Sequence, residues 1–478
     1  MAKDSLPRAL AVTGGIEIDS GKPSQCPGRW YNRVVQALAR RLKQPGVNVD
    51  LCQQFYLPTL KGSLIALLLR AGAAIMAFAT AFLLLFSPLS ADVQIGDRWV
   101  AVWGASPSVT SESITLNNHT VRQFALVAIG GRGQRLRVQL TNELGAEEVL
   151  VRAAHIALAS SFGSIVPNSD RTLTVSGRQS FVIPAGAPLV SDPVDFDLGA
   201  SLPNLWIVAV SLYLPYSTTV ETLHPNGWQT AYIMDGDRTG ATNLGNVSAT
   251  TQSRFFLSRI DAAAAPGAIV TLGDSITDGD GSTPDANGRW PDVLARRLAD
   301  AGCSACLPAA FVVNKGISGN RLLGNDGGPS ALARFDRDVL STPGGRYVIL
   351  LEGINDIGRN DETGVTADDL ITGYRQLISR AHSKGLYIFG GTLTPFHGSV
   401  YDPLAAPRSD RELMRQTVNN WIRSSGEFDA VIDFDAAVRD PAAPTQLLGI
   451  YDSGDHIHPS DAGYSAMANA VNLNLFGL

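Results

Sequence analysis

Cysteine is scarce in this chain, with four residues among 478. That number is too small for the disulfide scaffolds that hold many small secreted domains together. Cys303 and Cys306 form a lone Cys-x-x-Cys pair, and no second pair of zinc ligands lies nearby. We therefore expect a local disulfide or two free thiols at this place, and no metal site.

Positive charge is also in short supply. The chain has 38 Lys and Arg against 44 Asp and Glu, a net charge of −6, and no basic stripe. Nucleic-acid binders usually carry a basic surface, so no nucleic-acid partner is expected. A hydrophobic content of 45% with 17% charged residues is ordinary for a globular protein, and the length suggests two or three domains.

One uninterrupted apolar run is present, over residues 71–86. Basic residues precede it, and the small pair Ser90-Ala91 follows it. The order basic, apolar, small is typical of a secretory signal. Residues 61–91 are therefore predicted to be a signal peptide, which implies a secreted or periplasmic protein of bacterial type. The alternative is a membrane anchor through 64–86.

Residues 1–60 are either an N-terminal extension or lie upstream of a true start near residue 61. Within them, residues 16–30 resemble residues 276–290, and both stretches continue to Leu-Ala-Arg-Arg-Leu. The first copy lacks the Asp-Ser pair that precedes the second. It is a truncated look-alike or a chance similarity, and we assign it no catalytic role.

Short segments of alternating polarity follow from Asp92 to Asp261. The clearest of them cover residues 99–103, 121–129, 135–140 and 206–214. Turn residues separate these segments, and such spacing is typical of an all-β sandwich or jelly roll of about eight strands. We expect residues 92–261 to be a β accessory domain, and the run at 262–267 to be a linker.

Strands alternate with helices from Ala268 to the end of the sequence. The predicted strands are 268–272, 310–314, 346–351, 386–390 and 430–434. The predicted helices are 290–301, 329–340, 366–384, 408–425 and 460–473. Such alternation predicts an α/β domain over residues 268–478, with a parallel sheet covered on both faces.

The run Gly273-Asp274-Ser275 places a hydroxyl just beyond an apolar strand, where open α/β sheets bind ligands. A Ser nucleophile needs a base, usually His, and a third group to orient that base. Asp455 and His458 are three residues apart in a loop before the last helix, so one turn can bring them together. His456 is the competitor, but as the neighbour of Asp455 it would point away in an extended segment.

Two further loops follow predicted strands at the same edge of the sheet. Gly319 lies in the first, over residues 314–320, and Asn355 in the second, over residues 352–356. A Gly lets a backbone N–H approach closely, and an Asn amide is a neutral donor, so both suit a developing oxyanion. The run at 278–282 resembles a calcium loop but lacks the later bidentate Glu, so we expect a solvated turn.

Four blocks of the sequence together resemble the SGNH (GDSL-type) hydrolase family. In order they are Gly273-Asp274-Ser275, Gly319, Gly353-x-Asn355-Asp356 and Asp455-x-x-His458-Pro459. The resemblance implies a flavodoxin-like three-layer fold and ester hydrolysis without a cofactor. It implies Ser275 as nucleophile, His458 as base and Asp455 as the group that orients it. The Ser275 N–H, the Gly319 N–H and the Asn355 amide would form the oxyanion hole, with Gly273, Asp274, Gly353 and Asp356 in support.

We therefore expect a serine esterase acting on small esters, such as short acyl esters or O-acetyl groups on saccharides. Nothing in residues 268–478 looks like an apolar lid for long acyl chains. A lipase, lysophospholipase or acyltransferase acting on lipid is the first alternative, and a non-catalytic carbohydrate-binding protein is the second. The β region looks like the accessory domains that precede such hydrolases in some secreted bacterial esterases. The sequence leaves the oligomeric state open.

Overall fold

A computed structural model describes most of the chain from residue 98 onward. The described ranges are 98–109, 114–127, 134–161, 163–196, 205–263, 267–301, 310–404 and 410–477. The predictions for residues 1–91 and for Cys303 and Cys306 lie outside them. Within these ranges, no helix has the length and apolarity needed to cross a membrane.

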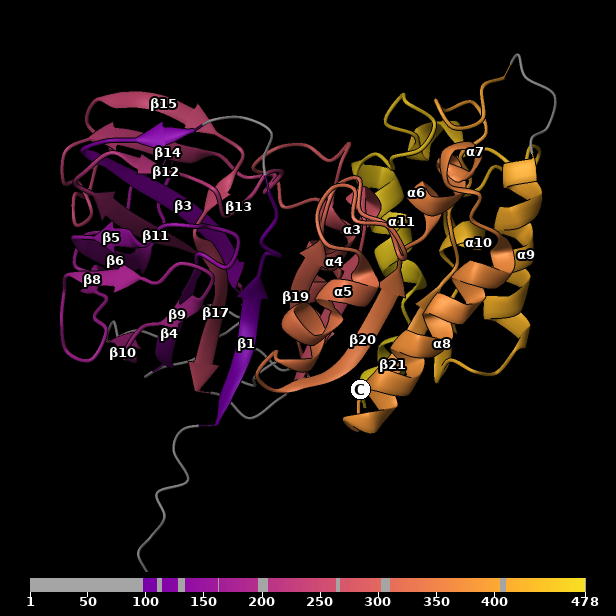
Figure 1. The fold of residues 1–478 in the computed structure, drawn as a ribbon, viewed down its shortest axis with the longest axis horizontal. Coiled ribbons are helices and arrows are strands. Elements are labelled where there is room, and N and C mark those ends of the chain that lie inside the picture. Colours follow the sequence, from indigo (N-terminus) through magenta and orange to yellow (C-terminus); the bar gives the residue numbers. More distant parts are fainter. Residues whose placement is uncertain are drawn as a thin grey trace, which may run out of the picture. The chain divides into compact units, whose positions relative to one another are not determined.

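The first part of the described chain, residues 99–263, forms antiparallel sheets and is called the β region below (Figure 1). One sheet has the order β1 (Trp99–Gly104), β17 (Leu257–Ala263), β4 (Gln134–Thr141) and β10 (Val194–Phe196), with β9 (Pro188–Val190) also paired to β4. The other has the order β15 (Val247–Thr251), β14 (Ala231–Asp235), β3 (His119–Val127), β11 (Trp206–Leu214), β6 (Ala153–Leu158) and β7 (Arg171–Thr172). The four segments predicted as strands correspond to β1, β3, β4 and β11.

Short strand pairs complete the β region. They are β2 (Thr115–Leu116) with β12 (Thr218–Thr219), β5 (Val149–Val151) with β8 (Phe181–Ile183), and β13 (Leu223–His224) with β16 (Arg254–Phe255). The β13–β16 pair is the one that matters for the site, because His224 lies in it.

The second part, from residue 267, is a five-stranded parallel sheet and is called the α/β region. Its order is β19 (Ala310–Gly316), β18 (Gly267–Gly273), β20 (Gly345–Leu351), β21 (Tyr387–Gly391) and β22 (Ala430–Ile432). Read as second, first, third, fourth and fifth strand, this is the flavodoxin-like order. It confirms the predicted fold class.

Helices cover both faces of the parallel sheet (Figure 1). The long ones are α4 (Trp290–Ala301), α8 (Ala367–Ser383), α9 (Asp410–Ser424) and α11 (Asp461–Ala470). Shorter ones are α3 (Ser275–Asp278), α5 (Ala331–Phe335), α6 (Ile354–Gly358), α7 (Asn360–Thr363) and α10 (Phe434–Val438). Helix α4 packs against α11, whereas α5 and α9 pack against α8. Helix α8 starts where a capping box predicts, since Thr366 and Asp369 each bond the other's backbone N–H.

Some predicted boundaries differ from the structure. The helix expected at 329–340 is α5 followed by a π-helical turn, η1 (Asp336–Leu340), and the last helix ends at Ala470 before a 3-10 turn, η3 (Leu473–Phe476). The linker expected at 262–267 is shorter, because Ala262 and Ala263 pair with β1 and Gly267 with β19. Pairing with neighbouring strands overrides the weak local preference of an Ala-rich run.

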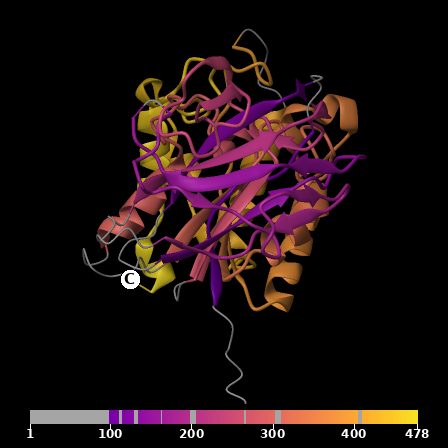
Figure 2. The same ribbon diagram turned by 90° about the vertical axis from the view of Figure 1, so that its left-hand side faces the viewer.

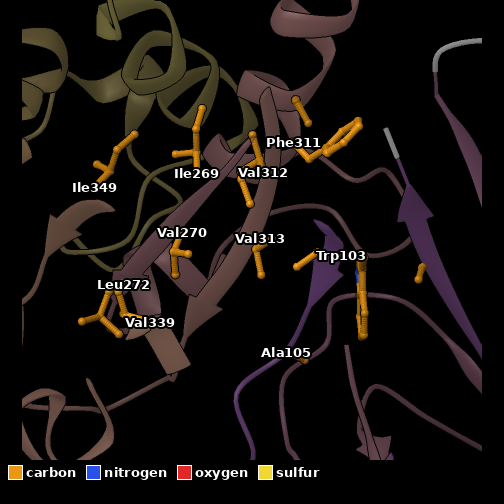
Figure 3. Packing of buried hydrophobic residues seen from close by; sticks show 14 of the residues in the cluster. Trp103, Ala105, Ile269, Val270, Leu272, Phe311, Val312, Val313, Val339 and Ile349 are labelled. Atoms are coloured by element: carbon orange, nitrogen blue, oxygen red, sulfur yellow. The ribbon is translucent and has the colours of Figure 1, made fainter. Parts of the chain in front are cut away.

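The β region packs directly on the edge of the parallel sheet. Figure 3 shows Trp103 of β1 and Ala105, which follows β1, beside Val312 and Val313 of β19. Buried residues of both regions form one hydrophobic cluster. The backbone N–H of Ala101 also donates to the carbonyl of Pro343, at 2.9 Å. Figure 2 gives the view onto the β region, with the α/β region behind it. The two regions therefore share a core.

Candidate active site

Ser275, His458 and Asp455 form a continuous hydrogen-bonded chain. Ser275 Oγ lies 2.8 Å from His458 Nε2, and His458 Nδ1 lies 2.5 Å from Asp455 Oδ2. Asp455 Oδ1 also accepts the backbone N–H groups of Ile457 and His458. The loop thus closes on its own carboxylate, which holds the imidazole in a single orientation toward the Ser.

The competing histidine makes a different pair. His456 has a left-handed backbone conformation, with φ of 64°, and its Nδ1 lies 2.6 Å from Asp452 Oδ2. Its side chain is 47% exposed, compared with 19% for His458. Of the two histidines, the structure therefore brings His458 to Ser275, as the spacing predicts.

Charges around His458 set its proton affinity. Burial works to lower the pKa of His458, but the hydrogen bond to Asp455 and the charges of Asp280 and Asp455 raise it above its ordinary value. For Asp455 the balance runs the other way: burial favours protonation, but the bonds from His458 hold its pKa well below its usual range. The pair is therefore suited to accept a proton at His458 while Asp455 stays ionised.

The turn that carries Ser275 is built from Gly273 and Asp274. A Cβ on Gly273 would lie 2.3 Å from the carbonyl oxygen of Leu351 on the neighbouring strand, so only Gly fits there. Asp274 caps helix α3 by accepting the N–H of Ile276 at 3.0 Å. Burial raises the pKa of Asp274 to about 7. The Ser hydroxyl is thereby held at the carboxyl end of β18.

The two predicted donor loops follow β19 and β20, the strands on either side of β18. Gly319 has φ of 74°, a left-handed conformation that favours Gly, and a Cβ there would meet open space. The Asn355 side chain donates to the carbonyl of Asn320 at 2.8 Å, so the loops meet beside Ser275's strand. Gly353, also left-handed, precedes helix α6, on which Asn355 and Asp356 lie. Asp356 accepts the N–H groups of Leu322 and Leu323 and so fixes the first loop.

A comparison with protein-family models matches residues 271–466 to the GDSL-like Lipase/Acylhydrolase family. Residues 271–466 form a GDSL-type acylhydrolase domain. The members of this family are carboxylic ester hydrolases, and the match covers residues 271–466 of this chain. A search of curated proteins found no match.

Among solved structures, an acetylxylan esterase from Geobacillus stearothermophilus is similar at 24% identity, over 44% of this chain and 96% of that one, with a TM-score of 0.33. A GDSL-like lipase from Bacteroides thetaiotaomicron is similar at 17% identity, over 44% of this chain and 87% of that one, with a TM-score of 0.33.

Arg334 is a buried residue of the acylhydrolase domain that sequence reasoning missed. Its guanidinium donates to the carbonyls of Gly273 and Lys315 and to the Asn320 side chain, at 2.9, 2.6 and 2.9 Å. Its charge is paired with Asp338, at 3.0 Å. One side chain thus joins the nucleophile strand to the first oxyanion loop. Only its i, i+4 spacing to Asp338 was visible in the sequence.

The run at 278–282 is not the solvated turn that we expected. Asp278 is buried, and its Oδ2 accepts both the N–H and the hydroxyl of Ser318, each at 3.0 Å. Its Oδ1 lies 2.9 Å from Nε2 of His224, a buried residue of the β region. The expectation was wrong because a residue more than 50 positions away supplies the partner that makes burial of Asp278 possible.

The side chains of Asp280 and Tyr401 act on two groups next to Ser275, the His458 imidazole and the Asn355 amide. Asp280 Oδ2 lies 3.9 Å from His458 Nε2, and burial raises the pKa of Asp280 to about 6. The hydroxyl of Tyr401 donates to Asn355 Oδ1 at 2.8 Å. Because that bond occupies the amide oxygen, it orients the Asn355 NH₂ group toward the oxyanion loop. Tyr401 belongs to no motif, and the calcium-loop resemblance of the run that contains Asp280 gave no sign of its contact with His458.

Proposed function

We propose that Ser275 is the nucleophile of a serine esterase that acts through an acyl-enzyme. The observation that carries this proposal is the continuous Ser275–His458–Asp455 chain, with separations of 2.8 and 2.5 Å. His458 Nε2 takes the hydroxyl proton as Ser275 Oγ attacks the ester carbonyl. Asp455 stabilises the imidazolium that results, and the proton then passes to the departing alcohol.

The carbonyl oxygen becomes negatively charged during attack and needs donors aimed at it. The candidates are the backbone N–H groups of Ser275 and Gly319 and the side-chain amide of Asn355. They come from the carboxyl ends of three neighbouring strands, the middle one carrying the nucleophile. In the second half of the reaction, His458 activates a water molecule, which releases the acid and regenerates Ser275.

Short acyl groups, including O-acetyl groups on saccharides, are the substrates that we propose. The surroundings of Ser275 support this, because Asp280, Asn355, Ser318 and Tyr401 present polar atoms there. These polar groups offer a long alkyl chain little apolar surface to pack against, whereas a small acyl group needs less of it.

The test compares variants of the two neighbouring histidines in hydrolysis of p-nitrophenyl acetate. Ser275→Ala and His458→Ala are each expected to lower kcat by at least about 10³-fold. His456→Ala is the matched control, and its kcat should stay within a few-fold of wild type. A fluorophosphonate probe should label wild type but not Ser275→Ala. Undiminished turnover by Ser275→Ala would exclude the proposed nucleophile, and an unlabelled wild type would favour a non-catalytic binding protein.

The acyl specificity is tested separately with p-nitrophenyl esters of increasing chain length. We expect kcat/KM to be highest for acetate or butyrate and to fall for longer chains. A maximum at about ten carbons or more would instead indicate a lipase or an acyltransferase acting on lipid.

We also propose that the protein is exported, on the strength of the basic, apolar and small residues in order over 61–91. N-terminal sequencing of the protein recovered from its native host tests this. A chain that begins near Asp92 in the medium or periplasm is the expected result. A chain that retains residues 64–86 in the membrane fraction would indicate an anchor.

A further inference from the structure

A cleft of about 320 Å³ lies where the β region meets the loop that follows Ser275. Its floor is the outer face of the six-stranded sheet, where Phe124, Ile207 and Tyr232 belong to a small apolar cluster separate from the main core. The rings of Phe124 and Tyr232 meet edge to face, with centroids 6.1 Å apart. Asp285 forms part of its wall, so both regions build it.

The wall of this cleft is rich in hydrogen-bonding groups. Ser160, Gln229, Thr230 and Asp285 line it, together with the half-buried Tyr232. Asp285 has φ of 65°, and its carboxylate is fixed by the Thr230 N–H and hydroxyl, at 2.6 and 2.7 Å. A carboxylate has lone pairs left after two such bonds, so it can accept further hydroxyl groups.

The same loop connects the cleft to the catalytic His. Asp280 lies near His458, and five residues later Asp285 lines the cleft, a separation of at most about 18 Å along an extended chain. Trp228 is near both residues. Its carbonyl accepts the Asp285 N–H at 3.0 Å, and its indole lies close enough to Asp280 to lower the pKa of that carboxyl against the effect of burial.

The geometry points to this cleft as a subsite for the alcohol part of the ester, and to a saccharide as that alcohol. This inference rests on the proposed esterase function. The half-buried Tyr232 ring below and the fixed Asp285 carboxylate at the side suit a sugar, which has an apolar ring face and a hydroxyl edge. An alkyl chain in the same place would cover the Asp285 carboxylate and leave it without hydration.

The experiment measures how Tyr232→Ala and Asp285→Ala affect two kinds of substrate in the full-length protein. One is p-nitrophenyl acetate, and the other is a set of acetylated sugars, glucose pentaacetate and acetylated xylo-oligosaccharides. We expect the KM for the acetylated oligosaccharides to rise about tenfold, with kcat changed less. The ratio of kcat/KM between the oligosaccharide and p-nitrophenyl acetate should fall accordingly. The matched control is Tyr216→Ala, an exposed aromatic of the β region outside the cleft, and it should keep the wild-type ratio.

A binding measurement separates this inference from the function on which it rests. Calorimetry with Ser275→Ala and deacetylated xylo-oligosaccharides should show binding that Tyr232→Ala weakens in the double variant. If wild type hydrolyses no ester but this binding is present, the esterase proposal fails and the subsite stands. If p-nitrophenyl acetate is hydrolysed and neither cleft variant changes the KM for any acetylated sugar, the subsite is wrong. A rise in KM confined to long-chain p-nitrophenyl esters would assign the cleft to acyl chains.

Discussion

The two regions of this protein bury their strands differently. Strand β18 of the α/β region is buried at all seven positions, whereas β4 of the β region alternates and β15 is exposed at four of its five positions. A parallel sheet covered on both faces can present polar groups only beyond the ends of its strands. An antiparallel sheet can leave an outer face free, and the proposed saccharide cleft occupies such a face.

This difference explains why the functional residues of the α/β region lie in recognisable sequence motifs, whereas those of the β region do not. The α/β region concentrates its chemistry in short runs that follow strands, such as Gly273-Asp274-Ser275. The β region contributes isolated residues, above all His224, which holds Asp278 from across the boundary. A single residue within a strand carries no local signature of such a role. The following variants test whether the β region and the α/β region contribute independently to stability and to catalysis.

The largest effect is expected from replacing a buried arginine in each region. Arg334→Met and Arg122→Met each remove a guanidinium that is fully buried and multiply hydrogen bonded. Arg334→Met breaks a buried ion pair and should lower the free energy of unfolding by about 3–5 kcal/mol. Arg122→Met leaves buried carbonyl groups without a donor and should lower it by about 1–3 kcal/mol. Chemical denaturation measures both. Only Arg334→Met should also lower kcat of the folded enzyme, because only Arg334 joins Gly273 to the oxyanion loop. Equal kcat in both variants would contradict this role.

His224→Phe is expected to lower kcat by about 10- to 100-fold, with a smaller change in KM. Asp278 would lose its partner from the β region, and the Ser318–Gly319 segment that Asp278 holds would shift. His155→Phe is the matched control, since it breaks a His–Asp pair of 2.7 Å inside the β region. Its kcat should stay near the wild-type value.

His224→Gln adds a second readout for the same contact, because a Gln amide can still donate to Asp278. It should recover part of the kcat lost in His224→Phe. A purely structural role for His224 would instead lower stability in every variant and leave kcat of the folded fraction unchanged.

Tyr401→Phe should lower kcat by about fivefold, the equivalent of one net hydrogen bond of about 1 kcal/mol. The variant leaves the Asn355 amide held by the Asn320 carbonyl alone, so it is oriented less firmly toward the oxyanion position. Tyr213→Phe removes a comparable hydroxyl from the β region, one that donates to Asn118 at 2.8 Å. Steady-state kinetics on p-nitrophenyl acetate should show a loss in the first variant and none in the second.

The smallest effect is expected in the pH profile. His458 must be neutral to act as base, so kcat/KM should rise with pH through the pKa of His458. The Asp280 carboxylate stabilises the protonated imidazole and raises this pKa. Asp280→Asn should therefore move the acidic limb of kcat/KM to lower pH. Asp195→Asn, at an exposed site of the β region, should leave the limb in place. A shift to higher pH in Asp280→Asn would contradict the assignment.

Much of the fold could be predicted because, in many segments, no distant contact overrides the local hydrophobic pattern. The helix at 290–301 matches α4, and the strand at 206–214 matches β11. Predictions were less accurate where distant contacts decided the backbone. Residues 336–340 form a π-helical turn next to the buried Arg334–Asp338 pair, and the Ala-rich run at 262–263 is held in a strand by β1.

The amino-acid sequence by itself determined the order of strands and helices and the positions of Ser275, Gly319, Asn355, Asp455 and His458. These features depend on local hydrophobic periodicity and on short sequence motifs, which are present whatever the tertiary contacts are. Only the tertiary structure decided that Asp278 is buried against His224, that Arg334 joins two loops, and that Tyr401 orients Asn355. Such contacts join residues between 14 and 61 positions apart, and the burial that makes them strong exists only once the elements that carry them have packed together.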